Sequence, residues 1–451
     1  MFTGKVGFVS FGEVNSPKEI ISRKCLETRK LLEAEGLELV STGYVSDDEA
    51  GKDVARAITD LSREDFDVLV VCLAGWIPSH AVIGVISEFS HKPMILWGLA
   101  GYIENGRLVT TADQAGTTAL RKVMEDMGYN FIYVYNTING PSRIGRILRF
   151  IKAAQAVSLL RSSKIGMMGY RDMNLYGTMF EGISLRSKIG VEVEIFEMLE
   201  IVQKIEKLTE QEISQVVDST KKAWDFEKEA KAVTLETGAS YYLAIKEKIL
   251  ERNYAGISLI DVDGMKKLAG FPPAMVFMLL ADNLSVCTIP ENDTLGAVTQ
   301  LIVKYLTGQI AAYFEFYEFM EDRLLVGVPD FVPSQVVEGK VKVCPAGFGS
   351  FSEGILNVSK VKTGKITLCR LIGQGDRYKM HVATGEAVTP GAWEEAGWAQ
   401  PAPQLPSLEF IPDTTVEEFA EKVASQHYIL SYGDNREIIR DFCKILKIEV
   451  I

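Results

Sequence analysis

The sequence predicts an α/β fold in which two doubly wound parallel-sheet domains precede a mainly antiparallel, β-barrel-like C-terminal domain. Strand-like and helical segments alternate through the first two thirds of the chain, which is the order of a parallel sheet with covering helices. One strand, in FDVLVVCLAGW, is an almost unbroken apolar run, as expected for a central strand buried on both faces. From Gln309 onward, short strand-like runs are separated by Gly, Pro and Asp turns. These changes predict domains at 1–161, 162–308 and 309–451.

The elements of the first domain follow from hydrophobic periodicity and turn residues. Helical spacing runs from Pro17 to Glu35 and ends at Gly36, and a last helix runs from about Arg143 to Leu160. No GxGxxG motif follows the first strand, so a dinucleotide site is not indicated. The predicted strands are KVGFVSF, LELVSTG, FDVLVVCLAGW, PMILWG and NFIYVYN, and the helices between them include DVARAITDLS and GTTALRKVMEDMG.

The second domain repeats the strand–helix order. A helix is predicted near Thr178 to Lys188, and the highly charged stretch from Glu210 to Arg252 is predicted to be a long helical stretch with a solvated face. Prolines open the helix in PPAMVFMLLADN, and Gly308 ends the one in ENDTLGAVTQLIVKYLTG. The predicted strands are SSKIGMMGY, VEVEIFEM, AGISLIDVDG and SVCTIP.

Short strands characterise the third domain, and its tail from Thr415 to Ile451 is expected to return to pack on another domain. AQPAPQLPSLEFIP is interpreted as a Pro-rich loop before a last helix, SQHYILSYG and a final helix–strand pair. The predicted strands of the barrel or sandwich are AAYFEFYEF, LLVGVPDF, VKVCPAGFG, GKITLCRLIG and KMHVATGEAV.

The composition excludes several classes of partner. The chain of 451 residues has 48 Lys and Arg against 60 Asp and Glu, a net charge of −12, and its basic residues are not concentrated anywhere. Nucleic acids and anionic membranes recruit contiguous basic residues, so neither is expected as a partner. The N-terminal segment lacks a signal-peptide pattern, which predicts a cytoplasmic protein. Six scattered cysteines without a CxxC pair indicate buried thiols rather than a zinc cluster or a disulfide framework.

Glu291, Glu315 and His427 form the sharpest candidate site. Only four histidines are present, so few imidazoles are available as metal ligands. Glu291 lies between a predicted strand and the next helix, where an α/β sheet presents functional side chains. Glu315 lies in the following strand, which we expect to pair beside the first because a single helix separates them. Two carboxylates and one imidazole suit a divalent cation such as Mn²⁺, Mg²⁺ or Co²⁺.

Each of these residues also has an ordinary structural explanation. Glu291, Asn292 and Asp293 could cap the helix that follows them and interact with its positive end. Glu315 alternates with aromatic residues in a strand, where an acid commonly faces solvent. His427 precedes a hydrophobic run and could be a hydrogen-bonded core histidine.

Five further residues are weaker candidates for substrate binding. Trp76 and His80 lie near the carboxyl end of a predicted strand, and Trp76 could stack on a sugar or simply pack. Asp261, in LIDVDG, lies in an acidic segment that also fits a turn. Trp393 and Trp398 lie in a loop that could be a sugar lid or pack on the surface.

The segment that begins at Glu291 resembles the metal site of the L-fucose isomerase-like family. In PENDTLGAVTQLIVKYLTGQIAAYFEF, an E-N-D-S-L-type motif is followed by a helix ending in L-T-G and a strand with a second acid. Glu291 and Glu315 fall on the two family carboxylates without a gap. The ending SQHYILSYGDNREIIRDFCKILKIEVI is also similar and places His427 on the family's metal histidine. SKIGMMGYRDMNLYGTMF and the segment around Trp76 are more weakly similar, and Asp261 loosely matches a glutamine that contacts the sugar.

The resemblance implies an Mn²⁺-dependent aldose–ketose isomerase, with Co²⁺ or Mg²⁺ as alternative ions. It also implies trimers or hexamers in which a neighbour's first domain helps to close each site, and His80 is then a candidate for contacting that neighbour's substrate. Glu291 and Glu315 would act as base and acid on an open-chain sugar that passes through a cis-enediol. The chain is shorter than fucose isomerases, and it lacks the extra histidine of the related arabinose isomerases after Glu315, so the resemblance does not identify the sugar.

Two other classes of function are compatible with these residues. A non-catalytic sugar-binding or regulatory protein on the same scaffold would need no set of metal ligands. A metal-dependent epimerase or aldolase would share the enediolate. Sensitivity to a chelator separates the first class from an isomerase, and product analysis separates the second.

Overall fold

In the computed structural model, the described residues are 4–347, 351–391 and 405–451. The chain divides into two compact units, Met1–Ser158 and Leu159–Ile451. The predicted fold class is confirmed, because two parallel sheets and a closed antiparallel barrel are present. The division into three domains stays a prediction. No helix within the described residues combines the length and hydropathy needed to cross a bilayer.

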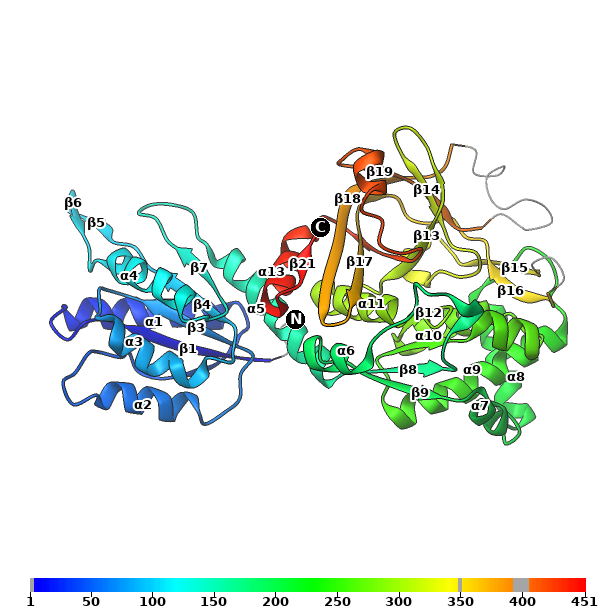
Figure 1. The fold of residues 1–451 in the computed structure, drawn as a ribbon, viewed down its shortest axis with the longest axis horizontal. Coiled ribbons are helices and arrows are strands. Elements are labelled where there is room, and N and C mark those ends of the chain that lie inside the picture. Colours follow the sequence, from blue (N-terminus) through cyan, green and yellow to red (C-terminus); the bar gives the residue numbers. More distant parts are fainter. Residues whose placement is uncertain (1–3, 348–350, 392–404) are drawn as a thin grey trace. The chain divides into compact units, whose positions relative to one another are not determined.

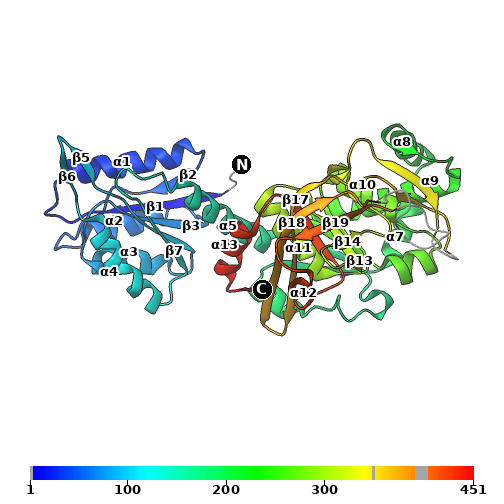
Figure 2. The same cartoon turned by 90° about the horizontal axis from the view of Figure 1, so that it is seen from above.

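Unit 1 contains a parallel sheet in the order β2-β1-β3-β4-β7. All six residues of β3 are buried, as the apolar run predicted, and helices cover both faces of the sheet (Figures 1 and 2). Its strands are β1 Lys5–Phe11, β2 Glu38–Ser41, β3 Val68–Leu73, β4 Met94–Gly98 and β7 Phe131–Tyr135, with a hairpin of β5 Tyr102–Glu104 and β6 Arg107–Val109. The helices are α1 Lys18–Ala34, α2 Lys52–Leu61, α3 Ser79–Ile86 and α4 Asp113–Asp126, and α5 Ile144–Ser162 begins in unit 1 and ends within unit 2.

The first part of unit 2 is a second parallel sheet, in the order β12-β11-β8-β9. Helix α11 packs against this sheet and against the barrel strands β17 and β20 (Figure 1). The strands are β8 Lys164–Met168, β9 Glu192–Phe196, β11 Gly256–Leu259 and β12 Cys287–Ile289. The helices are α6 Gly182–Lys188, α7 Met198–Ile205, α8 Glu210–Ala223, α9 Ala232–Arg252, α10 Ala274–Leu284 and α11 Thr294–Thr307.

The stretch 210–252 is mostly helical, as predicted, but it is not one continuous helical stretch. Two helices, α8 and α9, occupy it, and the short strand β10 Asp225–Phe226 separates them because it pairs with β15 Lys342–Ala346. The charged residues Glu236, Glu247 and Arg252 of α9 are exposed, as the predicted solvated face requires, but eleven other residues of this helix, Tyr242 and Ile245 among them, are buried. The charge averaged over the whole stretch concealed the apolar surface of its second half.

The last part of unit 2 is a closed antiparallel barrel of six strands, in the order β17-β20-β13-β14-β19-β18, with β17 and β18 completing the ring. β21 adds to β18 in parallel. The barrel strands are β13 Ala312–Phe319, β14 Leu324–Gly327, β17 Gly364–Gln374, β18 Arg377–Val388, β19 Ser407–Pro412 and β20 Tyr428–Tyr432. The remaining elements are β21 Glu449–Val450, α12 Val416–Ala420 and α13 Arg436–Leu446.

Two predictions about the strands of this region are corrected. The end of the Pro-rich loop, in SLEFIP, is strand β19, which lies between β14 and β18 and is needed to close the ring. VKVCPAGFG does not join the barrel, because β15 pairs with β10 and with β16 Gly354–Asn357 in a separate sheet. In both cases pairing with strands far away in the sequence decided which sheet the segment joins. The local composition of the segment does not indicate such partners.

Gly385 in β18 is expected to be essential for barrel packing. A Cβ atom at this position would lie 2.1 Å from the carbonyl oxygen of Ile411, a backbone atom of the paired strand β19. We expect Gly385→Ala to lower the free energy of unfolding by about 1–3 kcal/mol, measured by denaturant titration. Gly391→Ala is the control, because a Cβ there meets open space. Equal unfolding midpoints for the two variants would contradict the prediction.

Candidate metal centre

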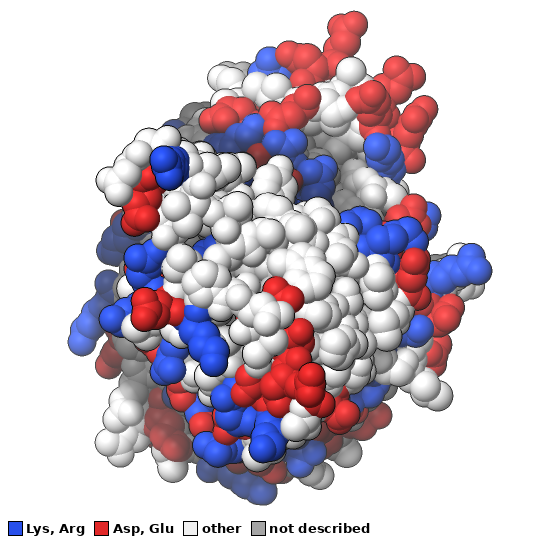
Figure 3. All heavy atoms as spheres, turned by 90° about the vertical axis from the view of Figure 1, so that its left-hand side faces the viewer, with Lys and Arg blue, Asp and Glu red and all other residues white. Residues whose placement is uncertain are grey.

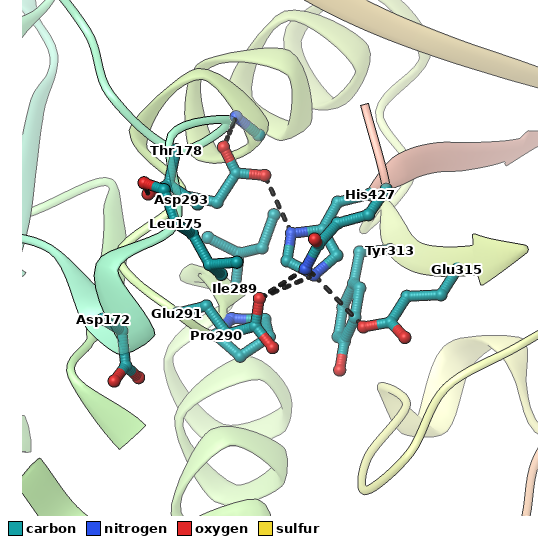
Figure 4. Close-up of polar contacts among 12 residues, drawn as sticks. Asp172, Leu175, Thr178, Ile289, Pro290, Glu291, Asp293, Tyr313, Glu315 and His427 are labelled. Carbon is teal, nitrogen blue, oxygen red and sulfur yellow. Dashed lines mark hydrogen bonds and ion pairs between the residues drawn. The ribbon is translucent and has the colours of Figure 1, made fainter. Parts of the chain in front are cut away.

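Glu291, Glu315 and His427 lie together in unit 2 (Figure 4). One ligand atom from each residue lies within 4.8 Å of the others. Nε2 of His427 is 3.2 Å from Oε1 of Glu315 and 3.6 Å from Oε2 of Glu291. The imidazole is fully buried, whereas the side chains of Glu291 and Glu315 remain 12% and 18% exposed. The three groups can therefore surround one cation and leave a side open to a small molecule.

The two glutamates meet in a different way from the one predicted. The strand of Glu315, β13, pairs with β20 and β14 in the barrel, whereas the strand before Glu291, β12, pairs with β11 in the parallel sheet. The expectation that the two strands are neighbours is therefore wrong. The chain leaves the parallel sheet through α11 and enters the barrel, so the carboxylates meet across two sheets. His427 joins them because it directly precedes β20, the neighbour of β13.

Glu291 sits in a strained turn between β12 and α11. Both Glu291 and Asn292 have left-handed backbones, with φ of 61° and 52°. Such conformations disfavour residues other than glycine and persist only where their surroundings hold them. The N–H of Glu291 donates to Oδ1 of Asp261 at 2.7 Å, and the amide of Asn292 donates to the carbonyl of Met168 at 2.9 Å. The turn is thus held from the ends of β8 and β11, and Glu291 points toward His427.

Helix capping, the alternative explanation for these acids, is the role of Asp293. Its Oδ1 accepts a hydrogen bond from the N–H of Gly296 at 2.9 Å, at the start of α11. The side chain of Glu291 makes no such contact: its Oε2 accepts from the amide of Gln426, the residue before His427. Within the motif, Asp293 therefore caps the helix, whereas Glu291 faces the candidate metal centre.

Asp293 also orients the imidazole. Its Oδ2 accepts from Nδ1 of His427 at 2.8 Å, and its two oxygens bind the guanidinium of Arg370, with Nη2 at 2.8 Å from Oδ1. All three side chains are buried. A hydrogen bond at Nδ1 leaves Nε2 free as a ligand, as is usual for metal-binding histidines. Sequence reasoning missed Arg370, although an arginine within the apolar run GKITLCRLIG was a visible signal.

Burial and charge shift the protonation of the centre. Burial raises the pKa of Glu291 to about 8, against the positive charge of His427, and the carboxylates of Asp261 and Glu315 add to the rise. Burial lowers the pKa of His427, but hydrogen bonds to Asp293 and Glu315 outweigh it and raise the value to about 10. Burial opposes ionisation of Asp293, yet Arg370 holds its pKa well below the usual range. A cation bound here would therefore replace protons.

The structure describes three of the five weaker candidates. Trp76 and His80 lie in unit 1 and are exposed. Asp261 is buried in unit 2, where its Oδ1 supports the turn of Glu291 and its Oδ2 pairs with Lys266 at 3.0 Å. Trp393 and Trp398 lie outside the described residues. That these five residues bind substrate stays a prediction.

The end of unit 1 at which its strands have their carboxyl ends carries a shallow hollow. It has a volume of about 440 Å³ and is lined by residues from the segments 100–101, 110–115 and 133–138. Figure 3 looks onto this end, and the middle of the face shows few charged side chains. This is the edge at which parallel sheets bind ligands. Trp76 follows β3 at the same edge.

Comparison with known proteins shows what this chain is similar to. Residues 326–451 match the family described as L-fucose isomerase, C-terminal domain. The L-arabinose isomerase of Shouchella clausii is 22% identical over 321 residues, which cover 68% of this chain and 63% of that protein. The resemblance to the L-fucose isomerase-like family is confirmed. A sulfoquinovose isomerase of Priestia megaterium is also 22% identical, over 383 residues that cover 81% of this chain and 80% of that protein. These relatives' names agree with the isomerase class predicted from the sequence.

Arg370 is expected to be required for stability as well as for orientation of the centre. Arg370→Met would leave the Asp293 carboxylate buried without its guanidinium partner, which costs about 3–5 kcal/mol of unfolding free energy. Denaturant titration measures the loss. Arg377→Met, at the exposed end of the same hairpin, is expected to change stability by no more than about 0.5 kcal/mol. Wild-type stability in Arg370→Met would show that the ion pair contributes nothing.

Proposed function

We propose that this protein is a divalent-metal-dependent aldose–ketose isomerase, which interconverts a free sugar or sugar derivative through a cis-enediol. The observation that carries the proposal is the convergence of two carboxylates and one buried imidazole within 4.8 Å. Relatives named L-arabinose isomerase and sulfoquinovose isomerase support the same reaction class. Both names contain a sugar, and we propose a small sugar as the substrate of this protein.

The residues present fit the proposed ion. Carboxylate oxygens and a neutral imidazole suit Mn²⁺, with Co²⁺ or Mg²⁺ as alternatives. Glu291, Glu315 and His427 would hold the ion, and Asp293 would keep the imidazole in the tautomer that presents Nε2. When bound, such an ion polarises a carbonyl and stabilises negative charge on neighbouring hydroxyl oxygens.

The carboxylates of the chain itself would move the protons. One of Glu291 and Glu315 removes the proton from C2 of the open-chain aldose while the carbonyl oxygen at C1 gains a proton, which gives the cis-enediol. Loss of the proton from O2 and return of one to C1 completes the ketose. Their partial exposure would let both carboxylates reach a sugar while the imidazole stays enclosed.

We also propose that the protein works as a homo-oligomer, a trimer or hexamer, in which the first domain of a neighbouring copy closes each site. The exposed Trp76 and His80, at the sparsely charged end of unit 1, are the proposed contacts to the neighbour's sugar. In this arrangement Trp76 would supply an aromatic surface to the site formed by unit 2 of the other copy.

Removal of divalent cations is expected to abolish ketose formation from an aldose panel, and Mn²⁺ is expected to restore it. Saturation with the ion at about 100 times its Kd is expected to stabilise the fold by about 2.7 kcal/mol, measured by thermal unfolding with and without chelator. Full activity after chelation would contradict the proposal. Formation of epimers or cleavage products, identified by chromatography, would indicate an epimerase or aldolase.

Glu291→Gln is expected to lower the isomerisation rate by about 10²–10⁴-fold, because an amide cannot exchange the proton. The measurement is deuterium incorporation at C2 of the sugar in D₂O, with metal content determined on the same sample. Glu318→Gln is the control, because Glu318 is exposed on β13, the strand that carries Glu315. A folded, metal-loaded Glu291→Gln protein that exchanges deuterium at the wild-type rate would refute the role of Glu291.

A further inference from the structure

A buried lysine, Lys266, lies near the metal centre and takes no part in the proposed reaction. Nζ of Lys266 is 3.0 Å from Oδ2 of Asp261 and 3.3 Å from Oδ2 of Asp330. The side chain of the lysine is 9% exposed and those of the two acids are 1% and 2% exposed. Among the ion pairs of the described residues, Lys266 is the one cation that either acid has. Charges buried this deeply are costly unless they are paired.

Each acid reaches a different side of the metal centre. Asp261 uses its other oxygen, Oδ1, to accept from the backbone N–H of Glu291 at 2.7 Å. Asp330 uses its Oδ1 to accept from the hydroxyl of Tyr313 at 3.0 Å. The ring of Tyr313 packs edge-on against the imidazole of His427, with centroids 5.1 Å apart at 76°. One ammonium therefore links the supports of two of the three candidate metal ligands.

An unusual backbone brings Lys266 to this place. Asp261–Leu268, directly after β11, forms a π-helix, in which the N–H of Met265 donates to the carbonyl of Ile260 at 3.0 Å. The expectation of a simple turn at this acidic segment is corrected. In an α-helix, residues five apart point in different directions, whereas the wider turn lets Asp261 and Lys266 meet. π-Helical turns are rare in proteins as a whole, but those that do occur are found frequently at functional sites.

The turn that carries Glu291 depends on this support. Glu291 and Asn292 both have left-handed backbones, and the hydrogen bond from Glu291 to Asp261 is one of the contacts that hold them. If the charge of Lys266 were absent, Asp261, Asp330 and Glu291 would form a group of buried acids without that cation. Repulsion among them would favour rotation of the Asp261 carboxylate away from the other acids, and the turn would lose its fixed acceptor.

We propose that Lys266 is a positioning residue of the metal centre, which fixes the Glu291 turn through Asp261 and the Tyr313 ring against His427 through Asp330. The inference deepens the proposed function and rests on it. Lys266 acts through these neighbours, without touching the ion or the sugar.

Lys266→Met, which keeps the length of the side chain and removes the charge, tests the proposal. The apo protein is titrated with Mn²⁺ in the absence of sugar, and we expect its Kd to rise about 10–100-fold, as for loss of residues that orient metal ligands. Lys266→Arg keeps the charge and is expected to recover most of the affinity. Lys267→Met is the matched control, because Lys267 is exposed and pairs with Asp263 outside this network.

A folded Lys266→Met protein with wild-type Mn²⁺ affinity would overturn the proposal. If that variant does not fold, Asp330→Asn decides, because it weakens the same link without leaving an unpaired acid: weaker Mn²⁺ binding supports the role, and unchanged binding overturns it. The proposed function fails separately, if the wild-type protein binds Mn²⁺ but converts no aldose. Absence of Mn²⁺ binding by the wild-type protein would overturn both.

Discussion

The buried ion pair between Asp293 and Arg370 is the interaction on which the rest of unit 2 depends. It joins the first turn of α11, at the end of the parallel sheet, to strand β17 of the barrel. The same carboxylate caps the helix and accepts a hydrogen bond from His427. Because one buried group satisfies a helix end, a guanidinium and an imidazole, a shift of the barrel against the sheet would leave a charge unpaired.

This link makes a composite site possible. Glu291 belongs to the parallel sheet, whereas Glu315 and His427 belong to the barrel, and neither layer alone would bring the three ligand atoms together. Hydrogen bonds from the ends of β8 and β11 hold the strained turn at Glu291. The parallel sheet, and not the local sequence preference, therefore stabilises this backbone conformation. Rigid layers on both sides suit a centre that must hold its ligands close together.

The family resemblance and the chemistry of the residues were enough to select the three candidate metal ligands. The E-N-D motif and the C-terminal histidine segment select Glu291, Glu315 and His427, and the structure brings those residues together. Sequence reasoning missed the groups that support these ligands. Arg370 lies in an apolar strand, and Lys266 follows Asp261 at a spacing that is meaningful only in a π-helix. Asp330 lies in a loop with no motif, and only its burial beside Tyr313 marks it.

By itself, the sequence determined the fold class, most strands of both parallel sheets and the chemical nature of the site, because hydrophobic period and residue type act locally. Only the tertiary structure decided that β13 leaves the sheet of β12, that β19 closes the barrel, and that 210–252 forms two helices. The physical reason is the same for these three features. Pairing between strands far apart in the chain, with the burial that it creates, outweighs the local conformational preference. The same long-range pairing places His427 beside Glu315 and Arg370 beside Asp293.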